Sequence, residues 1–382
     1  MPSPGQKVES AVLIALCIVL PLYEAPKNLA WLVYILIWFA NRARTRDFGG
    51  AWDLWDTLIA AWIASTFVVA AFAGLHGSEW RGALDSVRYG MVLWLLRRSR
   101  FTERQLRLLL GALVFSAVLG VGIAAWRVWA GTHERIELNS VGHVNHTAIY
   151  LAIVLGLCVS WLFAGPLRFV AGVAAAVLLL ALFATASRGA LAAGVLASGV
   201  IAAAWWRRSR WPALGMAIVL AATALVAVFG SATVFEKQKA QFAQGDILNL
   251  RGRAWDIAVG AWERHPWFGV GIDNFSLLTR AEEEPYRTLF THAHSLYLNT
   301  LAERGVVGAS LVLVLLFAAL VALVRARPRP PDSAQAWLLW GAALAAWIVT
   351  AVAGIVNTTL HHEHALLVAL LLGLWLGSRQ RA

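Results

Sequence analysis

The sequence predicts an all-α, polytopic membrane protein with about 12 transmembrane helices and one large loop that carries short helices. Three observations support this fold class: 60% of the residues are hydrophobic, only 14% are charged, and the mean hydropathy is +0.67. Soluble globular proteins carry roughly 25% charged residues. Most segments here are apolar on every side, as helices surrounded by lipid or buried in a membrane bundle are.

A hydrocarbon core about 30 Å thick requires roughly 20 apolar residues per helix. The first apolar run begins at Ala11 and lacks a small-residue cleavage motif, so it predicts a retained helix rather than a signal peptide. The predicted transmembrane helices cover residues 10–25, 28–41, 51–74, 83–96, 105–130, 144–164, 168–187, 189–206, 211–233, 304–324, 334–356 and 362–377.

These helices divide the chain into three parts. Residues 1–233 hold the first nine, residues 234–303 form the large loop, and residues 304–382 hold the last three. With the N-terminus in the cytoplasm, more than half of the 32 Lys and Arg residues fall in cytoplasmic segments. This asymmetry predicts that both termini are cytoplasmic and that the large loop lies on the outer face. The net charge of +11 is therefore explained by basic residues that orient the protein in the membrane and contact anionic lipids. It does not indicate binding to nucleic acid.

The same topology places all 10 histidines on the outer side or at its membrane edge, which indicates that the chemistry is there. Most of the 20 tryptophans lie near predicted helix ends, as interfacial belts do. The only cysteines, Cys17 and Cys158, lie in apolar runs and predict neither a disulfide framework nor a thiolate metal site.

The large loop is too rich in Trp, Phe and Leu to be disordered, and loops this long are usually functional. Residues 251–264 predict a short amphipathic helix lying on the membrane. His265-Pro266 should end that helix, and Gly269-Val270-Gly271 predicts a tight turn before Phe275.

Basic residues and histidines occur together in this loop. Arg251 and Arg253 precede His292 and His294. A guanidinium binds phosphate oxygens through a planar fork of donors, and a histidine transfers protons near neutral pH. The pattern fits phosphate recognition beside a general base. It equally fits a solvated loop with ordinary interfacial basic residues.

Arg188 lies at the outer end of a short hairpin between two apolar runs. An ionisable group at such a site is costly and counts as a functional hypothesis. The alternative is an arginine that extends to the headgroups and holds a helix end.

The histidines do not by themselves predict a metal site. His292-x-His294 and the group His361, His362 and His364 lack flanking carboxylates apart from Glu363. The chain has no phosphate-binding loop and no Asp-x-Asp motif. We therefore predict an activity that needs neither metal nor cofactor.

Several motifs between residues 140 and 310 resemble those of one known superfamily, although most are weak alone. They are Gly142-His143-Val144-Asn145-His146, Ser187-Arg188-Gly189-Ala190, Arg251-Gly-Arg-Ala-Trp255, His265-Pro-Trp-Phe-Gly-Val-Gly-Ile-Asp-Asn-Phe275, His292-Ala-His-Ser-Leu-Tyr-Leu298 and Leu301-Ala-Glu-Arg-Gly-Val-Val-Gly308. Together they resemble the O-antigen ligase and polymerase superfamily, whose members are bacterial inner-membrane enzymes with about a dozen helices and one large periplasmic loop.

The resemblance implies a glycosyltransferase with an undecaprenyl-diphosphate-linked O-antigen donor and no nucleotide sugar or metal. Arg188 and Arg251 would stabilise the diphosphate, and His294 would deprotonate the acceptor. Direct attack would invert the anomeric centre. Substrate contacts are expected from Arg253, His292, His146, Asn145 and Tyr297.

The functions that remain open are a ligase, a polymerase or related lipid-linked glycan transferase, and a flippase or transporter. A ligase would transfer O-antigen to lipid A–core, and the compact, basic chain suits that anionic acceptor. A polymerase would instead join lipid-linked repeat units. A polysaccharide flippase or transporter would predict internal repeats and broken helices near the membrane midplane, whereas the polar groups here gather at one face. We favour the ligase, acting as a monomer.

Overall fold

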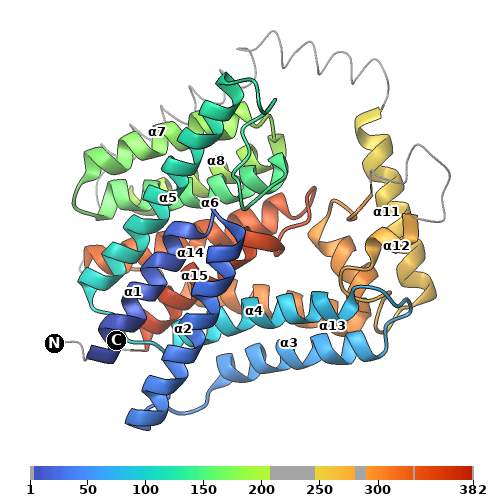
Figure 1. Ribbon diagram of the computed structural model, residues 1–382, viewed down its shortest axis with the longest axis horizontal. Coiled ribbons are helices and arrows are strands. Elements are labelled where there is room, and N and C mark those ends of the chain that lie inside the picture. Colours follow the sequence, from blue (N-terminus) through green and yellow to red (C-terminus); the bar gives the residue numbers. More distant parts are fainter. Residues whose placement is uncertain (1–3, 207–245, 280–289, 330–331, 381–382) are drawn as a thin grey trace.

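The computed structural model describes residues 4–206, 246–279, 290–329 and 332–380, and all regular structure in these ranges is helical (Figure 1). The helices are α1 (Pro4–Val19), α2 (Glu24–Thr45), α3 (Leu54–Ala71), α4 (Glu79–Arg97), α5 (Glu103–Trp129), α6 (Val144–Ala164), α7 (Arg168–Ala184), α8 (Arg188–Trp205), α11 (Asp246–Arg264), α12 (Phe275–Thr279), α13 (Leu296–Arg325), α14 (Ala334–Ala353) and α15 (His362–Arg379). The predicted all-α fold class is confirmed. The helix predicted at residues 211–233 lies outside the described ranges.

Six of the described helices are long and apolar enough to cross a membrane: α3, α5, α6, α8, α13 and α14. The chain is thus a multi-pass membrane protein. α7 is equally apolar but shorter. The total of 12 transmembrane helices stays a prediction.

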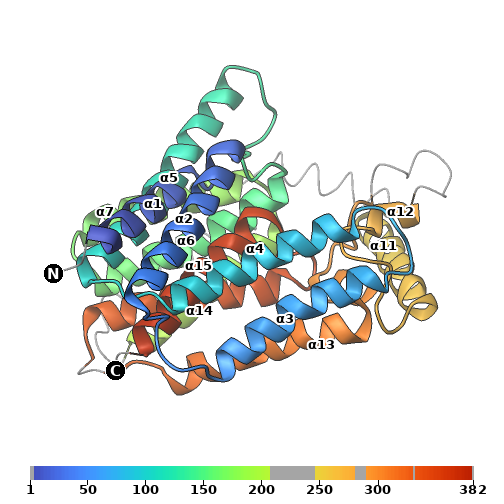
Figure 2. The same cartoon turned by 60° about the horizontal axis from the view of Figure 1, so that its bottom comes forward.

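The core of the bundle is built around α6 and α14. In α6, 89% of the most apolar 18-residue window is buried, and in α14 the share is 83%, so these helices are enclosed mainly by protein. α6 packs against α7, α8 and α14, while α15 packs against α4. Beside this core, α3 lies along α4 and α13, and the axes of the three helices are nearly parallel (Figure 2).

Both chain termini lie at one end of the molecule, and α11 and α12 lie at the other end in both views (Figures 1 and 2). At the end near the termini, Asp53 and Asp56 form a capping box that begins α3. Asp56 is fully buried and also binds the buried side chains of Arg97 and Arg98. These residues form an ion cluster in which each charge is paired. The cluster holds the start of α3 against the end of α4.

α13 begins earlier than predicted. Its first residue is Leu296, so residues 296–303, which the sequence assigned to the large loop, are helical. The Ser295 side chain accepts a hydrogen bond from the N–H of Leu298, and the N–H of Leu296 donates to the carbonyls of Gly354 and Asn357. These bonds satisfy N–H groups that a helix start leaves unpaired, so the helix extends beyond its apolar run.

α13 is interrupted at Gly305, whose φ of 58° and ψ of −168° are not helical. The interruption frees backbone groups that pair with the segment following α11. We call residues 266–271 and 302–307 the clasp. Four backbone hydrogen bonds close it: Val306 N to Pro266 O at 2.8 Å, Val307 N to Trp267 O at 3.2 Å, Val270 N to Ala302 O at 2.9 Å and Gly271 N to Glu303 O at 2.9 Å.

We expect Gly305→Ala to destabilise the protein strongly. The backbone conformation at Gly305 is one that only glycine adopts readily, and strain of this kind costs about 1–3 kcal/mol. A Cβ there would also lie 2.3 Å from the carbonyl carbon of Trp267, so the clasp would have to open. Thermal unfolding of purified protein should show a clear drop in Tm. The matched control is Gly122→Ala in α5, where a Cβ meets nothing within 4 Å. Equal Tm values for the two variants would contradict the proposed importance of the clasp.

α11 ends at Arg264, directly before His265-Pro266, as predicted. Gly269 and Gly271 have φ values of 67° and 102°, which confirms the tight turn. The position of this helix on the membrane surface stays a prediction, and one face of it packs against the protein. Its fully buried stripe consists of Ala254, Ala258 and Ala261, in one apolar cluster with Ala293 and Ala302. Small residues at this spacing let the helix lie closely on the rest of the protein, chiefly on α13.

Candidate active site

Arg188 is the first residue of α8 and is exposed at the turn that follows α7. The turn is held by the Thr185 hydroxyl, which donates to the carbonyl of Leu182 at 2.6 Å. The next residue, Gly189, lies so close to the loop before α15 that a Cβ would be 2.7 Å from Cγ2 of Val356. The glycine therefore allows the α7–α8 turn to pack against residues 354–361 with Arg188 at its edge.

Arg251 approaches Arg188 from α11. Its side chain is half-buried, and its pKa is lowered by burial and, next, by the positive charge of Arg188. Among the described residues, no hydrogen bond or ion pair joins either guanidinium to an acidic group. Two like charges in one neighbourhood, with no described carboxylate paired to either, form a site suited to an anion. The structure therefore brings these two predicted residues into one neighbourhood.

The segment that carries His292 and His294 is fixed by the first turns of α13. The N–H of Ala293 donates to Oδ1 of Asn299 at 2.9 Å, and Nδ2 of Asn299 donates to Glu303 at 2.9 Å. His294 has a φ of 50°, a left-handed conformation that is uncommon outside glycine. Such strain is most often kept at functional sites, where the surrounding contacts determine it.

His292 lies beside His294 and within a larger group of imidazoles. Burial lowers the pKa of His292 to about 4, and charges on His362 and His294 act in the same direction. His292 is therefore neutral at pH 7. Because the charge of His294 contributes to the lowered pKa of His292, the two side chains lie close together.

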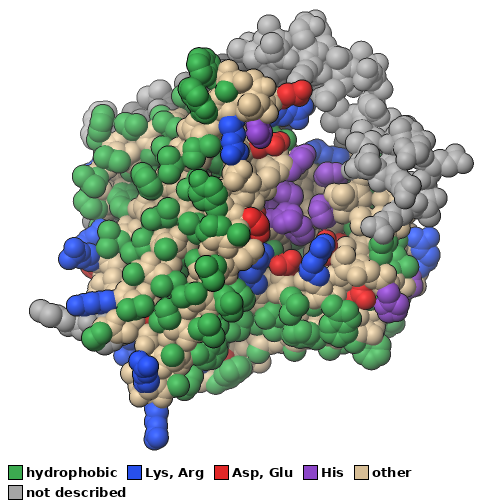
Figure 3. Space-filling model, viewed as in Figure 1, with side chains coloured by type: hydrophobic (Ala, Val, Ile, Leu, Met, Phe, Trp, Pro, Cys, Tyr) green, Lys and Arg blue, Asp and Glu red, His purple; other side chains and the backbone are tan. Residues whose placement is uncertain are grey.

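Histidines from two distant parts of the chain surround His146, at the start of α6. The ring centroid of His146 lies 6.5 Å from that of His292, 6.1 Å from His361, 5.1 Å from His362 and 5.4 Å from His364. Figure 3 shows histidine side chains gathered in a hollow of the molecule, with acidic and basic side chains around them. His146 and His292 were both predicted as site residues. His361, His362 and His364 were not, although the confinement of all histidines to one side was a signal for them.

The remaining predicted site residues have different surroundings. The Tyr297 hydroxyl donates to the carbonyl of Ala351 at 2.9 Å and so anchors α13 to α14. Asn145 is half-buried in the first turn of α6, and its backbone N–H donates to Nδ1 of His143. Arg253 lies on the exposed side of α11. Their proposed contacts with substrate stay predictions.

A polar cavity of about 590 Å³ lies next to the histidines, between α2, α4, α13 and the start of α15. His292, His361 and His362 line it, whereas Arg188, Arg251 and His294 are not among its described lining residues. Its charged walls are held by ion pairs: Arg81 with Asp273, Arg88 with Asp85, and the buried Lys27 with Glu24 and Glu363. Paired charges of both signs suit a polar, hydroxyl-rich ligand.

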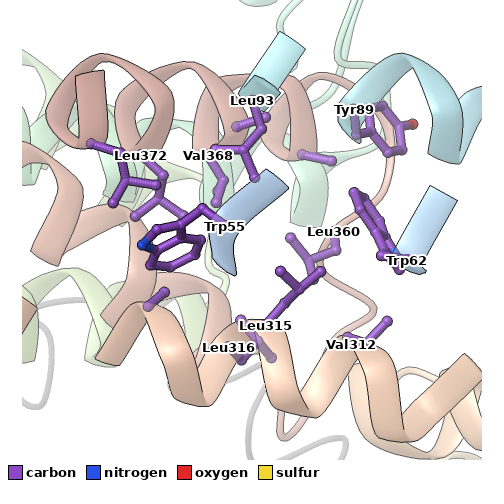
Figure 4. A pocket seen from close by; sticks show the side chains of 14 residues that line it. Trp55, Trp62, Tyr89, Leu93, Val312, Leu315, Leu316, Leu360, Val368 and Leu372 are labelled. Atoms are coloured by element: carbon purple, nitrogen blue, oxygen red, sulfur yellow. The ribbon is translucent and has the colours of Figure 1, made fainter. Parts of the chain in front are cut away.

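An apolar cavity, shown in Figure 4, adjoins the polar one. Four residues line both: Trp62, Tyr89, Val312 and Leu360. Beyond them the wall is apolar, with Trp55 from α3, Leu93 from α4, Leu316 from α13 and Val368 from α15. The two adjoining cavities are thus polar at the histidine end and apolar between the helices, an arrangement that fits a ligand with a lipid chain.

Residues 173–313 match the O-antigen ligase family. The match begins within α7, ends within α13, and includes Arg188, Arg251 and His294. It also includes both halves of the clasp, whereas His146 and His361–His364 lie outside it. No curated protein matches the chain.

Proposed function

We propose, from the membership of residues 173–313 in the O-antigen ligase family, that this protein transfers a glycan from undecaprenyl diphosphate to lipid A–core. The observation that carries the proposal is the pair formed by Arg188 and Arg251, which lie together without an acidic partner in the described structure. A diphosphate is the part of such a donor that two guanidinium groups would bind. His294, in the segment before α13, is the proposed base.

The proposed reaction is a single displacement. The acceptor hydroxyl attacks the anomeric carbon, a new glycosidic bond forms on one face, and the bond to the diphosphate oxygen breaks on the other. Attack from the opposite face inverts the anomeric centre. Arg188 and Arg251 stabilise the charge that develops on the leaving diphosphate. His294 takes the proton of the acceptor hydroxyl.

The two adjoining cavities support an amphipathic substrate. The apolar cavity between α3, α4, α13 and α15 is suited to part of a lipid chain, and the polar cavity is suited to sugar hydroxyls. A lipid-linked glycan has both parts. We propose that the donor enters from the membrane and presents its diphosphate beside the histidines.

We further propose that the site faces the periplasm and that both termini are cytoplasmic, in a bacterial inner membrane. The position of both termini at one end of the molecule, with α11 at the other, supports this topology. The excess of Lys and Arg in the predicted cytoplasmic segments supports it independently.

The direct experiment offers purified protein a lipid-linked glycan donor and, in separate reactions, two acceptors. A ligase should extend lipid A–core and release undecaprenyl diphosphate, and the product should have inverted anomeric configuration. Transfer to lipid-linked repeat units alone would instead establish the polymerase. Release of undecaprenyl diphosphate while neither acceptor is extended would contradict both transfer reactions.

We expect the transfer to proceed in excess chelator, because no step of the proposed mechanism uses a metal or a nucleotide. The measurement is the initial rate of transfer with and without EDTA, at a temperature where the stripped protein stays folded by circular dichroism. A rate that falls in EDTA and returns with added metal would contradict metal independence, provided that the fold is unchanged.

A further inference from the structure

Three imidazoles that line the polar cavity converge on one point. His292 precedes α13, whereas His361 and His362 begin α15. One ring nitrogen from each residue lies within 4.8 Å of the corresponding nitrogens of the other two. The ring centroids of His292 and His361 are 4.7 Å apart, and those of His361 and His362 are 3.8 Å apart. His146 reaches the same group from α6, with its centroid 5.1 Å from that of His362.

These rings are available as ligands. Nδ1 of His292 and Nδ1 of His361 are buried and have no hydrogen-bond partner in the described structure. A buried polar nitrogen without a partner is costly and calls for an explanation. A neutral imidazole keeps the lone pair that binds a metal.

We propose that His292, His361 and His362 bind a divalent transition-metal ion, with zinc as the representative ion and His146 as the candidate fourth ligand. Tetrahedral zinc with nitrogen ligands at 2.0–2.1 Å holds those nitrogens about 3.4 Å apart, so small side-chain rotations suffice to close the site. Magnesium and calcium prefer oxygen ligands, and this group offers nitrogens only. With three histidines bound, a fourth position is open to His146 or to a ligand in the cavity.

A bound ion would join three segments that meet at the site. Residues 290–295 and 354–361 are already connected, because the N–H of Leu296 donates to the carbonyls of Gly354 at 2.7 Å and Asn357 at 3.0 Å. The ion would add a link from His292 to His361 and His362, and through His146 to α6. Its role is to hold the cavity wall together, and it is independent of the transfer reaction.

The test uses the full-length protein in detergent with its affinity tag removed and its metal stripped by EDTA. Zinc is titrated in competition with a chromophoric chelator. We expect one zinc ion per chain and a rise in Tm on binding, because an ion that binds only the folded state stabilises it. Cobalt(II) should give visible absorption bands typical of a four-coordinate site.

Two variants and a matched control identify the ligands. His361→Ala should weaken zinc binding by more than about 100-fold, because loss of even an outer partner of a metal ligand costs 10–100-fold. His362→Gln is the second variant, at an exposed position, and it should also weaken zinc binding. The control is His133→Ala, in the exposed loop between α5 and α6. Zinc affinity and cobalt spectra that are the same in all three folded variants would overturn the proposal, as would the absence of stoichiometric zinc in the unmodified protein.

Discussion

Arg251→Ala should lower the rate of glycan transfer by about 10²–10³-fold, the loss that follows removal of one preorganised donor to a developing charge. The donor already carries the diphosphate that the arginine is proposed to bind, so donor affinity should fall as well. Arg251→Lys should recover little activity, because lysine keeps the charge and loses the bidentate fork. Donor affinity and single-turnover rates on folded protein measure the two effects separately.

Three further variants make this test specific. Arg264→Ala removes an exposed arginine from the other end of α11 and should leave transfer near the unmodified rate. Arg253→Ala tests whether Arg253 shares the role of Arg251. We expect it to lower the transfer rate less than Arg251→Ala does. Arg188→Ala should resemble Arg251→Ala, and the double variant should lose less than the two single losses combined, since both act on one diphosphate. Full additivity would indicate that the two arginines serve separate sites.

His294→Ala should lower the single-turnover rate by about 10²–10⁴-fold while donor affinity stays close to that of the unmodified protein. A general base acts on the acceptor proton in the transition state, so its loss affects chemistry rather than donor binding. His133→Ala is the control, because this exposed histidine lies outside the group around His146. If His294→Ala loses donor affinity as severely as Arg251→Ala does, His294 holds the loop or the donor and is not the base.

The sequence could predict those helices whose bounds are set by the length of an apolar run. The predicted helix at 144–164 coincides with α6, and α11 ends at Arg264 as the following His-Pro dipeptide indicates. The start of α13 could not be predicted this way, because it depends on hydrogen bonds from Leu296 to the distant carbonyls of Gly354 and Asn357. The non-helical backbone at Gly305 could not be predicted either, because it depends on backbone hydrogen bonds between α13 and residues 266–271.

In the candidate site, too, some features could be predicted from the sequence and others could not. The sequence singled out Arg188, Arg251 and His292 by residue type and by resemblance, and the structure places the two arginines together. The convergence of His292 with His361 and His362 depends on how the start of α13 is bonded to the segment before α15, which spacing along the chain does not specify. The polar and apolar cavities likewise arise from contacts between helices that are separated in sequence.

The clasp has a consequence for how the protein is made. Residues 266–271 bind backbone groups of α13, which follows them in the chain, and the carbonyls of Gly269 and Val270 also accept hydrogen bonds from Gly74 and Leu75, which precede them by far. During synthesis the N-terminal parts of a chain emerge first. The early partner is therefore already in the membrane when residues 266–271 leave the ribosome, while the late partner does not yet exist. Assembly of the site must then be among the last steps of biogenesis, after α13 has been inserted. A nascent chain released before that point would hold its earlier helices in the bilayer without a finished site.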